Sequence, residues 1–153
     1  MMRDTRVTGR QKEAVSRRAR GLCEYCRSPS HYSTQVFSAE HIIPRSAGGP
    51  TAADNLALAC QGCNNHKYTK TEAPDPATNA MVPLYHPRRD RWSDHFAWSE
   101  DATIVIGLTP TGRATVEALC LNRENVVNLR WALHAVGKHP PEEPGKAIEG
   151  EDQ

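Results

Sequence analysis

The chain lacks long apolar runs and has few aromatic side chains. Only 6% of its 153 residues are aromatic and 38% are hydrophobic, so a large apolar core is difficult to build and a structural metal would add useful stability. No run approaches the roughly 18 apolar residues of a membrane span. The first residues, MMRDTRVTGRQ, lack the apolar segment of a signal peptide. We therefore expect a cytoplasmic protein without a membrane partner.

Charge is close to balanced over the whole chain, with a formal net charge of +1, but it is unevenly distributed. Residues 1–20 contain seven Lys or Arg against two acidic residues, whereas residues 140–153 contain one Lys against five acidic residues. A basic body is compatible with a polyanionic partner such as DNA. The acidic end, with its prolines, predicts a disordered tail over 138–153.

The five cysteines have an informative spacing. Two Cys-x-x-Cys pairs, Cys23/Cys26 and Cys60/Cys63, surround the segment 39–45. In a reducing compartment such pairs are typical of a closed Zn²⁺ site with four thiolate ligands. The fifth, Cys120, lies in an apolar helical run, and we expect it to be a buried small side chain and not a ligand.

Local patterns predict an α+β fold. Thr8 followed by Gln11 has the pattern of a capping box and predicts a basic helix to about Arg20. Between the cysteine pairs, apolar and β-branched residues followed by Gly48-Gly49 predict a strand and a turn, and a short helix follows Cys63. The expected segments are a hairpin strand at 36–43, a helix at 64–70, a proline-rich extended stretch at 73–91, a strand at 102–108, and helices at 111–120 and 122–137.

The residues between and after the cysteine pairs favour metal-assisted phosphodiester hydrolysis. His41 is the candidate general base, since imidazole accepts a proton readily near neutral pH. Glu40 offers a carboxylate and Asn64 an amide oxygen, the hard ligands that Mg²⁺ prefers. His66 is the competing ligand and would suit Mn²⁺, Ni²⁺ or Zn²⁺ better than Mg²⁺. Adjacent strand residues face opposite sides, so Glu40 and His41 share one site only if the strand bends.

Three basic residues near these positions are candidates for DNA backbone contacts. Arg45 follows the hairpin strand, and Lys67 and Lys70 lie on the helix after the second cysteine pair. Together with the net basic body, they make DNA the expected partner. The sequence leaves open whether the protein is a monomer or a homodimer.

The run from Cys23 to Lys67 resembles the HNH endonuclease family in its zinc-stabilised form. The resemblance rests on Cys-x-x-Cys, then Glu-His-Ile-Ile-Pro-Arg-Ser with Gly-Gly, then Asp-Asn-Leu, then Cys-x-x-Cys-Asn-Asn-His-Lys. It implies a ββα-metal fold, cleavage of DNA with a divalent ion, His41 as general base and Glu40 as acidic metal ligand. It also implies that Asn55 orients the loop of that histidine. The chain departs from the common pattern at Asn64, where most members have histidine.

The resemblance completes the expected organisation: one HNH domain over residues 1–137 with its motif core at 22–70, an N-terminal helix, and a C-terminal strand plus two helices. The expected cofactors are structural Zn²⁺ and a catalytic divalent ion, Mg²⁺ or else Mn²⁺ or Ni²⁺. One alternative is a zinc-stabilised module that binds nucleic acid without cutting it. Another is a zinc knuckle that serves protein contacts.

Overall fold

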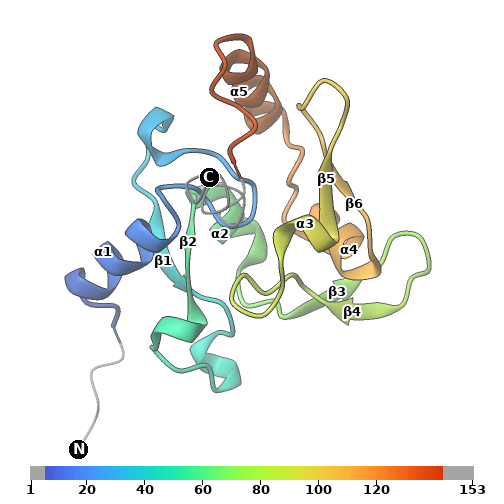
Figure 1. Ribbon diagram of the computed structural model, residues 1–153. Coiled ribbons are helices and arrows are strands. Elements are labelled where there is room, and N and C mark those ends of the chain that lie inside the picture. The colour runs from blue at the N-terminus through green and yellow to red at the C-terminus, as the bar shows by residue number, and fades with distance from the viewer. Residues whose placement is uncertain (1–5, 143–153) are drawn as a thin grey trace, which may run out of the picture.

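The computed structural model describes residues 6–142. Its first half forms the expected β-hairpin and helix. β1 (Ser38–His41) pairs antiparallel with β2 (Leu56–Ala59), with His41 opposite Leu56, and α2 (Gln61–Lys67) follows directly. Two short 3₁₀ turns in the connection between the strands, η2 (Arg45–Ala47) and η3 (Ala53–Asn55), shape the loop after His41. This is the α+β, ββα-metal core that the sequence predicted (Figure 1).

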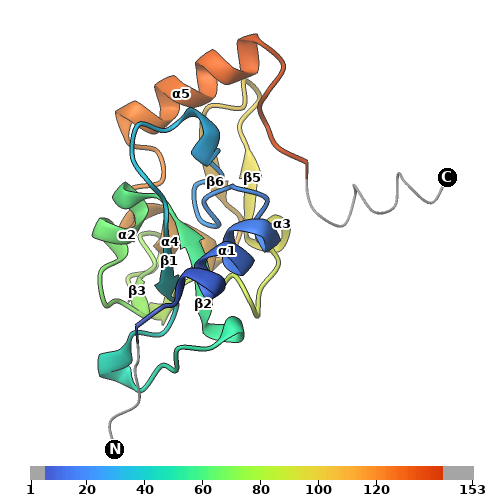
Figure 2. The same cartoon turned by 90° about the vertical axis from the view of Figure 1, so that its left-hand side faces the viewer.

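The N-terminal helix begins where the capping pattern placed it. α1 (Gly9–Arg18) has Thr8 as N-cap, and the side chains of Thr8 and Gln11 bond to each other's backbone N–H groups. The helix stops at Arg18, two residues before the expected end, because Arg20 and Gly21 both have positive φ. Figure 2 shows α1 lying across the β1–β2 hairpin, which it contacts along both strands.

The start of α2 differs from the prediction. The helix begins at Gln61 and not at Asn64, because the second cysteine pair forms its first turn. Cys60 is the N-cap, and its sulfur accepts a hydrogen bond from the backbone N–H of Cys63 at 3.4 Å. Asn64 therefore lies in the second turn, where its side chain is not needed for capping.

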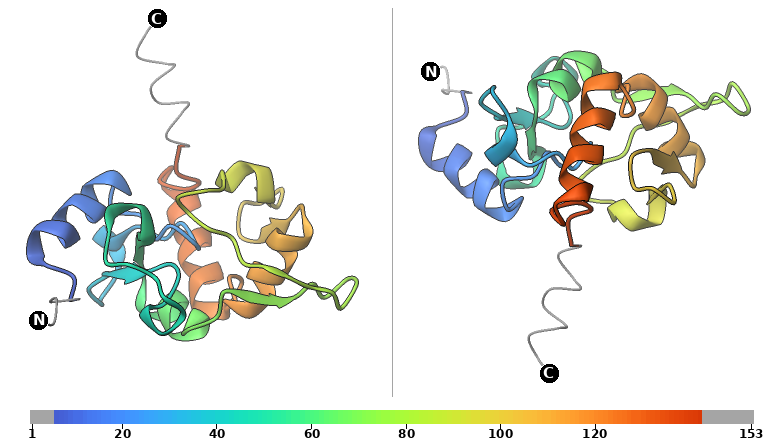
Figure 3. Two further views of the ribbon diagram at one scale, coloured as in Figure 1. Left: turned by 90° about the horizontal axis from the view of Figure 1, so that it is seen from below. Right: turned by 90° about the horizontal axis from the view of Figure 1, so that it is seen from above.

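The second half contains more strands than the sequence predicted. The proline-rich segment includes a short hairpin of β3 (Glu72–Pro74) and β4 (Met81–Pro83), which extends away from the body of the molecule (Figure 3). After α3 (Trp92–His95), β5 (Phe96–Trp98) pairs with β6 (Val105–Gly107). Only β6 falls within the strand expected at 102–108.

Two helices complete the described chain, α4 (Pro110–Ala118) and α5 (Glu124–Ala135). Thr109 is the N-cap of α4, so the helix begins one residue before the expected start at 111. α5 begins at Glu124, two residues after the expected start at 122, and the amide of Asn122 pairs with the backbone of Val105. Figure 3 shows α5 crossing between the N-terminal elements and the β3–β6 group. One buried cluster joins both halves, with members such as Leu56, Leu58, Phe96, Val105, Leu119 and Leu121.

Two expectations about the C-terminal half are corrected. Cys120 is exposed and not buried, since α4 ends at Ala118 and the chain turns at Cys120 with a φ of 50°. Residues 138–142, which were expected to belong to a disordered tail, are packed: His139 is buried, and Arg20 donates to the carbonyl of Glu142. Residues 143–153 lie outside the described part. Among the helices in 6–142, none is long and apolar enough to cross a membrane.

Candidate metal and nucleic-acid site

Four cysteine sulfurs converge at the base of the hairpin and α2. The ligand atoms of Cys23, Cys26, Cys60 and Cys63 all lie within 4.8 Å of one another, and all four residues are buried. The sulfurs of Cys26 and Cys60 are 3.7 Å apart and form no disulfide. A tetrahedron with zinc–sulfur bonds of about 2.3 Å has sulfur–sulfur edges of about 3.8 Å. The four side chains therefore fit one structural Zn²⁺ ion.

Two arginines from the C-terminal half surround this centre. Arg123, just before α5, directs its guanidinium at Cys60 Sγ (3.3 Å) and Cys63 Sγ (3.6 Å). Burial acts to lower the pKa of Arg123, but the nearby thiol sulfurs outweigh it and raise that pKa. Gly62 leaves room for the contact, because a Cβ atom there would lie 2.5 Å from the guanidinium. Arg130 of α5 is fully buried and donates to the carbonyls of Cys26 and Leu121.

His41 lies at the end of β1, where the chain bends away from the strand. Its Nε2 is 2.7 Å from the hydroxyl of Thr51 in the following loop. Burial lowers the pKa of His41, and the positive charge of Arg45 lowers it further. The lowered pKa favours the uncharged imidazole, and Nδ1 has no hydrogen-bond partner among residues 6–142.

Asn55 connects the two ends of the loop that follows His41. It is buried; its Oδ1 accepts from the N–H of Ile43 at 2.9 Å, and its Nδ2 donates to the carbonyls of Ile43 and Pro50 at 2.9 and 2.8 Å. Gly49 passes so close to Ile43 that a Cβ atom at Gly49 would overlap its carbonyl oxygen. These contacts fix the backbone immediately after the histidine.

Glu40 directly precedes His41 on β1 and lies near Lys67 of α2. Burial raises the pKa of Glu40, and the charge of Lys67 partly offsets this. Lys67 was expected to reach phosphate groups. The structure does not fit that expectation, because Lys67 is only 5% exposed and its Nζ donates to the carbonyl of Ile42 at 2.7 Å. Burial lowers the pKa of Lys67 to about 8, while Glu40 raises it.

The helical repeat separates the two competing ligands on α2. Asn64 lies three residues before Lys67, so both side chains project from the same face, toward the end of β1. His66 is two residues after Asn64, about 200° around the helix, and it is exposed. In residues 6–142 only the four cysteines form a compact group of three or more His, Cys, Asp or Glu ligand atoms. The side chains of Glu40, Asn64 and His66 make no hydrogen bonds within this range, which leaves all three available as ligands.

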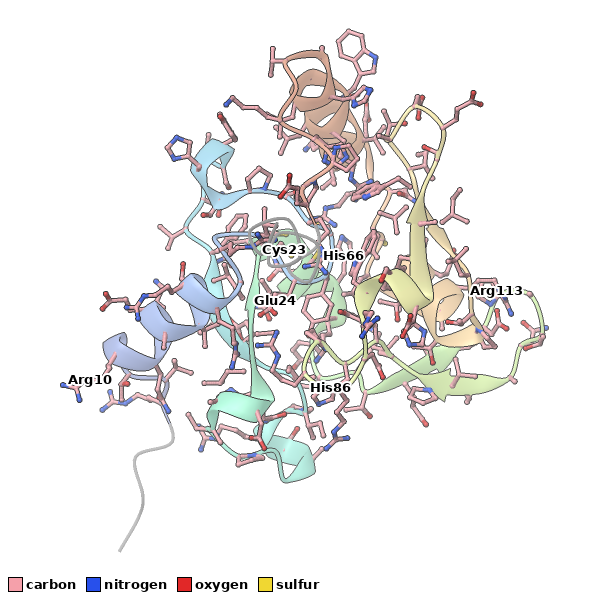
Figure 4. The ribbon with its side chains drawn as sticks, viewed as in Figure 1. Arg10, Cys23, Glu24, His66, His86 and Arg113 are labelled. Atoms are coloured by element: carbon pink, nitrogen blue, oxygen red, sulfur yellow. The ribbon has the colours of Figure 1, made fainter. Side chains whose placement is uncertain are left out.

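Of the basic residues expected to contact DNA, Arg45 and Lys70 are exposed. Arg45 lies in η2 of the loop after His41, and the Nζ of Lys70 is 3.0 Å from the carbonyl of His66. Figure 4 shows that Arg10 of the basic helix α1 also points outward, on the opposite side of the molecule from Arg113. Arg113 is bound to Asp75 at the β3–β4 turn.

Sequence reasoning missed three residues around the site. Thr51 has no recognisable motif, and its contact with His41 depends on the fold of the loop. Glu24, inside the first cysteine pair, is buried; it accepts from the N–H of Leu58 and pairs with Arg88. Burial lowers the pKa of Arg88 to about 10. This pair attaches the loop before α3 to the loop of the first cysteine pair.

Comparison with known proteins agrees with the geometry. The family model described as HNH endonuclease matches residues 23–70. No significant match was found among curated proteins or among solved structures. The matched segment contains both cysteine pairs, β1, β2 and α2, and a function of the nuclease or nucleic-acid-related type follows from it. Residues 23–70 are thus similar to the HNH endonuclease family, the family that the motifs resemble.

Proposed function

We propose that the protein is an HNH endonuclease that hydrolyses DNA phosphodiester bonds with the help of a divalent ion. The observation that supports this most directly is the setting of His41. One ring nitrogen of this histidine is held by Thr51, the other has no partner in the described part of the chain, and the pKa is lowered. A module that only binds nucleic acid needs no such group.

In this proposal His41 activates water. With Nε2–H donating to the Thr51 hydroxyl, the lone pair of the neutral ring lies on Nδ1, which accepts the proton of the attacking water. Asn55 keeps the loop that carries Thr51 joined to the end of the strand. The lowered pKa of His41 keeps its basic form populated at neutral pH.

Glu40 and Asn64 are the residues that would hold the catalytic ion. A half-buried carboxylate that has no hydrogen-bond partner within residues 6–142, together with an amide oxygen, suits Mg²⁺ or Mn²⁺. When bound, such an ion neutralises charge that develops on the scissile phosphate. The shared face of Asn64 and Lys67 supports Asn64 over His66, which projects away from β1. His66 remains the ligand to test against it.

Arg45 and Lys70 are the proposed contacts to the DNA backbone. Both are exposed and lie close in sequence to the reactive residues, Arg45 in the loop after His41 and Lys70 just beyond α2. Charge of this kind positions the phosphates without reading the base sequence. It also predicts that DNA binding weakens as the salt concentration rises.

A nicking assay on supercoiled plasmid tests the proposal. Zinc-loaded protein is given Mg²⁺, Mn²⁺ or Ni²⁺, and wild type is compared with His41→Ala. Removal of a general base should slow nicking by about 10²–10⁴-fold. His31→Ala, which alters an exposed histidine in the 3₁₀ turn Ser30–Tyr32, is the matched control and should cut normally.

The same assay decides between the candidate ligands and the alternative function. Asn64→Ala should reduce nicking more strongly than His66→Ala. Equal cleavage by wild type and His41→Ala would remove His41 from the mechanism. A wild-type protein that binds DNA and cuts it with none of the three ions would instead be the non-catalytic binding module.

A further inference from the structure

A pocket of about 290 Å³ lies between the HNH segment and the C-terminal half of the chain. Ile42 and Ile43, which directly follow His41, form one side together with Lys70. The loop between β4 and α3, which carries His86 and Arg89, forms the other side. Figure 4 shows His86 on this loop. The pocket thus begins one residue from the proposed general base, yet neither His41 nor Glu40 lines it.

The lining combines an apolar floor with a basic rim. Ile42 and Leu84 supply buried apolar surface, whereas Lys70 and Arg89 are exposed at the opening. The pocket also contains one acidic side chain, Asp90, but its carboxylate already accepts from the backbone N–H of His86 at 2.9 Å. A ligand with an apolar face and negative charge matches this lining.

His86 presents a defined hydrogen-bond donor. Its Nδ1 accepts from the backbone N–H groups of Arg88 and Arg89 at 3.2 and 3.3 Å. The proton of the neutral ring is therefore on Nε2. Nε2 has no hydrogen-bond partner among residues 6–142, although His86 is only 9% exposed. An acceptor on a bound molecule would satisfy it.

We propose that this pocket receives one unpaired nucleotide of the DNA, an inference that rests on the proposed nuclease function. Its volume is near the lower limit of about 300–1,000 Å³ for ligand pockets, which suits one nucleotide and excludes a stretch of duplex. Unpaired bases bind by stacking on aromatic rings or Arg planes and by hydrogen bonds to their edges, with cations on the backbone. Arg89 and Lys70 supply the charge, and His86 the donor.

The consequence is a preference for DNA with a bulged or single-stranded nucleotide next to the cleaved bond. Fluorescence anisotropy measures the affinity of the protein for two short duplexes, one fully paired and one with a single extra adenine. Zinc-loaded protein carrying His41→Ala is used without a second divalent ion, so that no DNA is cut. This protein should bind the bulged duplex about tenfold more tightly than the paired one.

Two further substitutions test whether the pocket is responsible. Arg89→Ala removes charge at the rim, and Thr71→Trp fills the pocket from an exposed lining position. Each should reduce the affinity ratio to about one. Arg91→Ala, which changes an exposed arginine outside the pocket, should leave it unchanged. Equal affinity for both duplexes, or a preference retained by Thr71→Trp, would overturn the proposal.

The outcome is separable from that of the proposed function, because binding is read without catalysis. A wild-type enzyme that nicks plasmid while its His41→Ala form shows no preference for the bulge keeps the nuclease function and loses the subsite. A preference that depends on Arg89 in a protein that never nicks keeps the subsite and rejects the nuclease.

Discussion

The hydroxyl of Thr51 lies 2.7 Å from Nε2 of His41, and the amide of Asn55 joins both ends of the loop between them. The orientation of the imidazole therefore depends on a loop contact and not on the strand alone. Gln11 of α1 adds to this arrangement, since its Nε2 donates to the carbonyl of Thr51 at 3.4 Å. The N-terminal helix thus supports the proposed base indirectly.

Thr51→Val should slow plasmid nicking by about tenfold while leaving DNA affinity unchanged. Valine has nearly the same shape as threonine but cannot bind Nε2, so the ring loses its fixed orientation. Thr51→Ser keeps the hydroxyl and should restore most of the rate. If the serine variant is as slow as the valine variant, Thr51 acts through packing and not through the histidine.

Asn55→Ala should lower the free energy of unfolding by about 2–4 kcal/mol. The substitution removes three side-chain hydrogen bonds and leaves the backbone groups of Ile43 without partners. Urea denaturation measures the change. Asp54→Ala, at the exposed neighbouring position, is the control and should stay within about 0.5 kcal/mol of wild type. A similar loss in both variants would refute a specific role for Asn55.

Cys60→Ser should abolish stoichiometric zinc binding, whereas Cys120→Ser should retain it. Of these two cysteines, Cys60 belongs to the cluster of four sulfurs, whereas Cys120 is exposed just beyond the end of α4. Elemental analysis of freshly purified protein gives the zinc content, and circular dichroism after chelation follows the fold. We expect zinc removal to unfold the core. Loss of zinc from Cys120→Ser would show that the ligands are misassigned.

Arg123→Met should weaken zinc binding by about 10–100-fold. The guanidinium donates to Cys60 and Cys63, and methionine of similar length removes both contacts together with the charge. Competition with a chromophoric chelator measures the affinity. Arg91→Met changes an exposed arginine and should bind zinc like wild type. Unchanged affinity in Arg123→Met would mean that the sulfurs do not need this partner.

His139→Gln should make stability less sensitive to acid between about pH 7.5 and pH 5.5. Burial lowers the pKa of His139, whose Nε2 donates to the carbonyl of Ala102 at 2.8 Å; Arg130 and His134 lower it further. A histidine with a lowered pKa stabilises the fold above its ordinary value of about 6.5, and this stability is lost as the pH falls below that value.

Thermal unfolding of both proteins across this pH range tests the expectation. Glutamine can keep the bond to Ala102 but does not titrate, so the melting temperature of the variant should fall less on acidification. Parallel curves for the two proteins would exclude His139 as a contributor.

The zinc-binding core was predictable from the sequence because its signals are local. Each signal spans only a few residues: the Cys-x-x-Cys spacing, the Glu40-His41 pair and the Gly-Gly turn. Together they specify the hairpin and the helix. The contact of Thr51 with His41 and that of Arg88 with Glu24 were not predictable, since they join residues 10 and 64 positions apart. Lys67 was misjudged because a lysine on a short helix is usually exposed, whereas here tertiary packing buries it.

The strands of the second half were hard to predict from the sequence for a different reason. β3 to β6 contain three residues each, too short for an alternating pattern, and Pro74 and Pro83 lie within β3 and β4. Proline is usually a signal against a strand, but it is tolerated in edge strands. Each of these hairpins has only two strands, so every strand in them is an edge.

Arg123 and Arg130 come from beyond the segment that carries the family motif, and both contact the cysteine loops. Four thiolates around one Zn²⁺ leave a net charge of −2, and these two guanidiniums balance it inside a buried environment. An excised fragment limited to residues 23–70 would keep every ligand but lose this compensation. The motif is therefore smaller than the unit that can retain its metal.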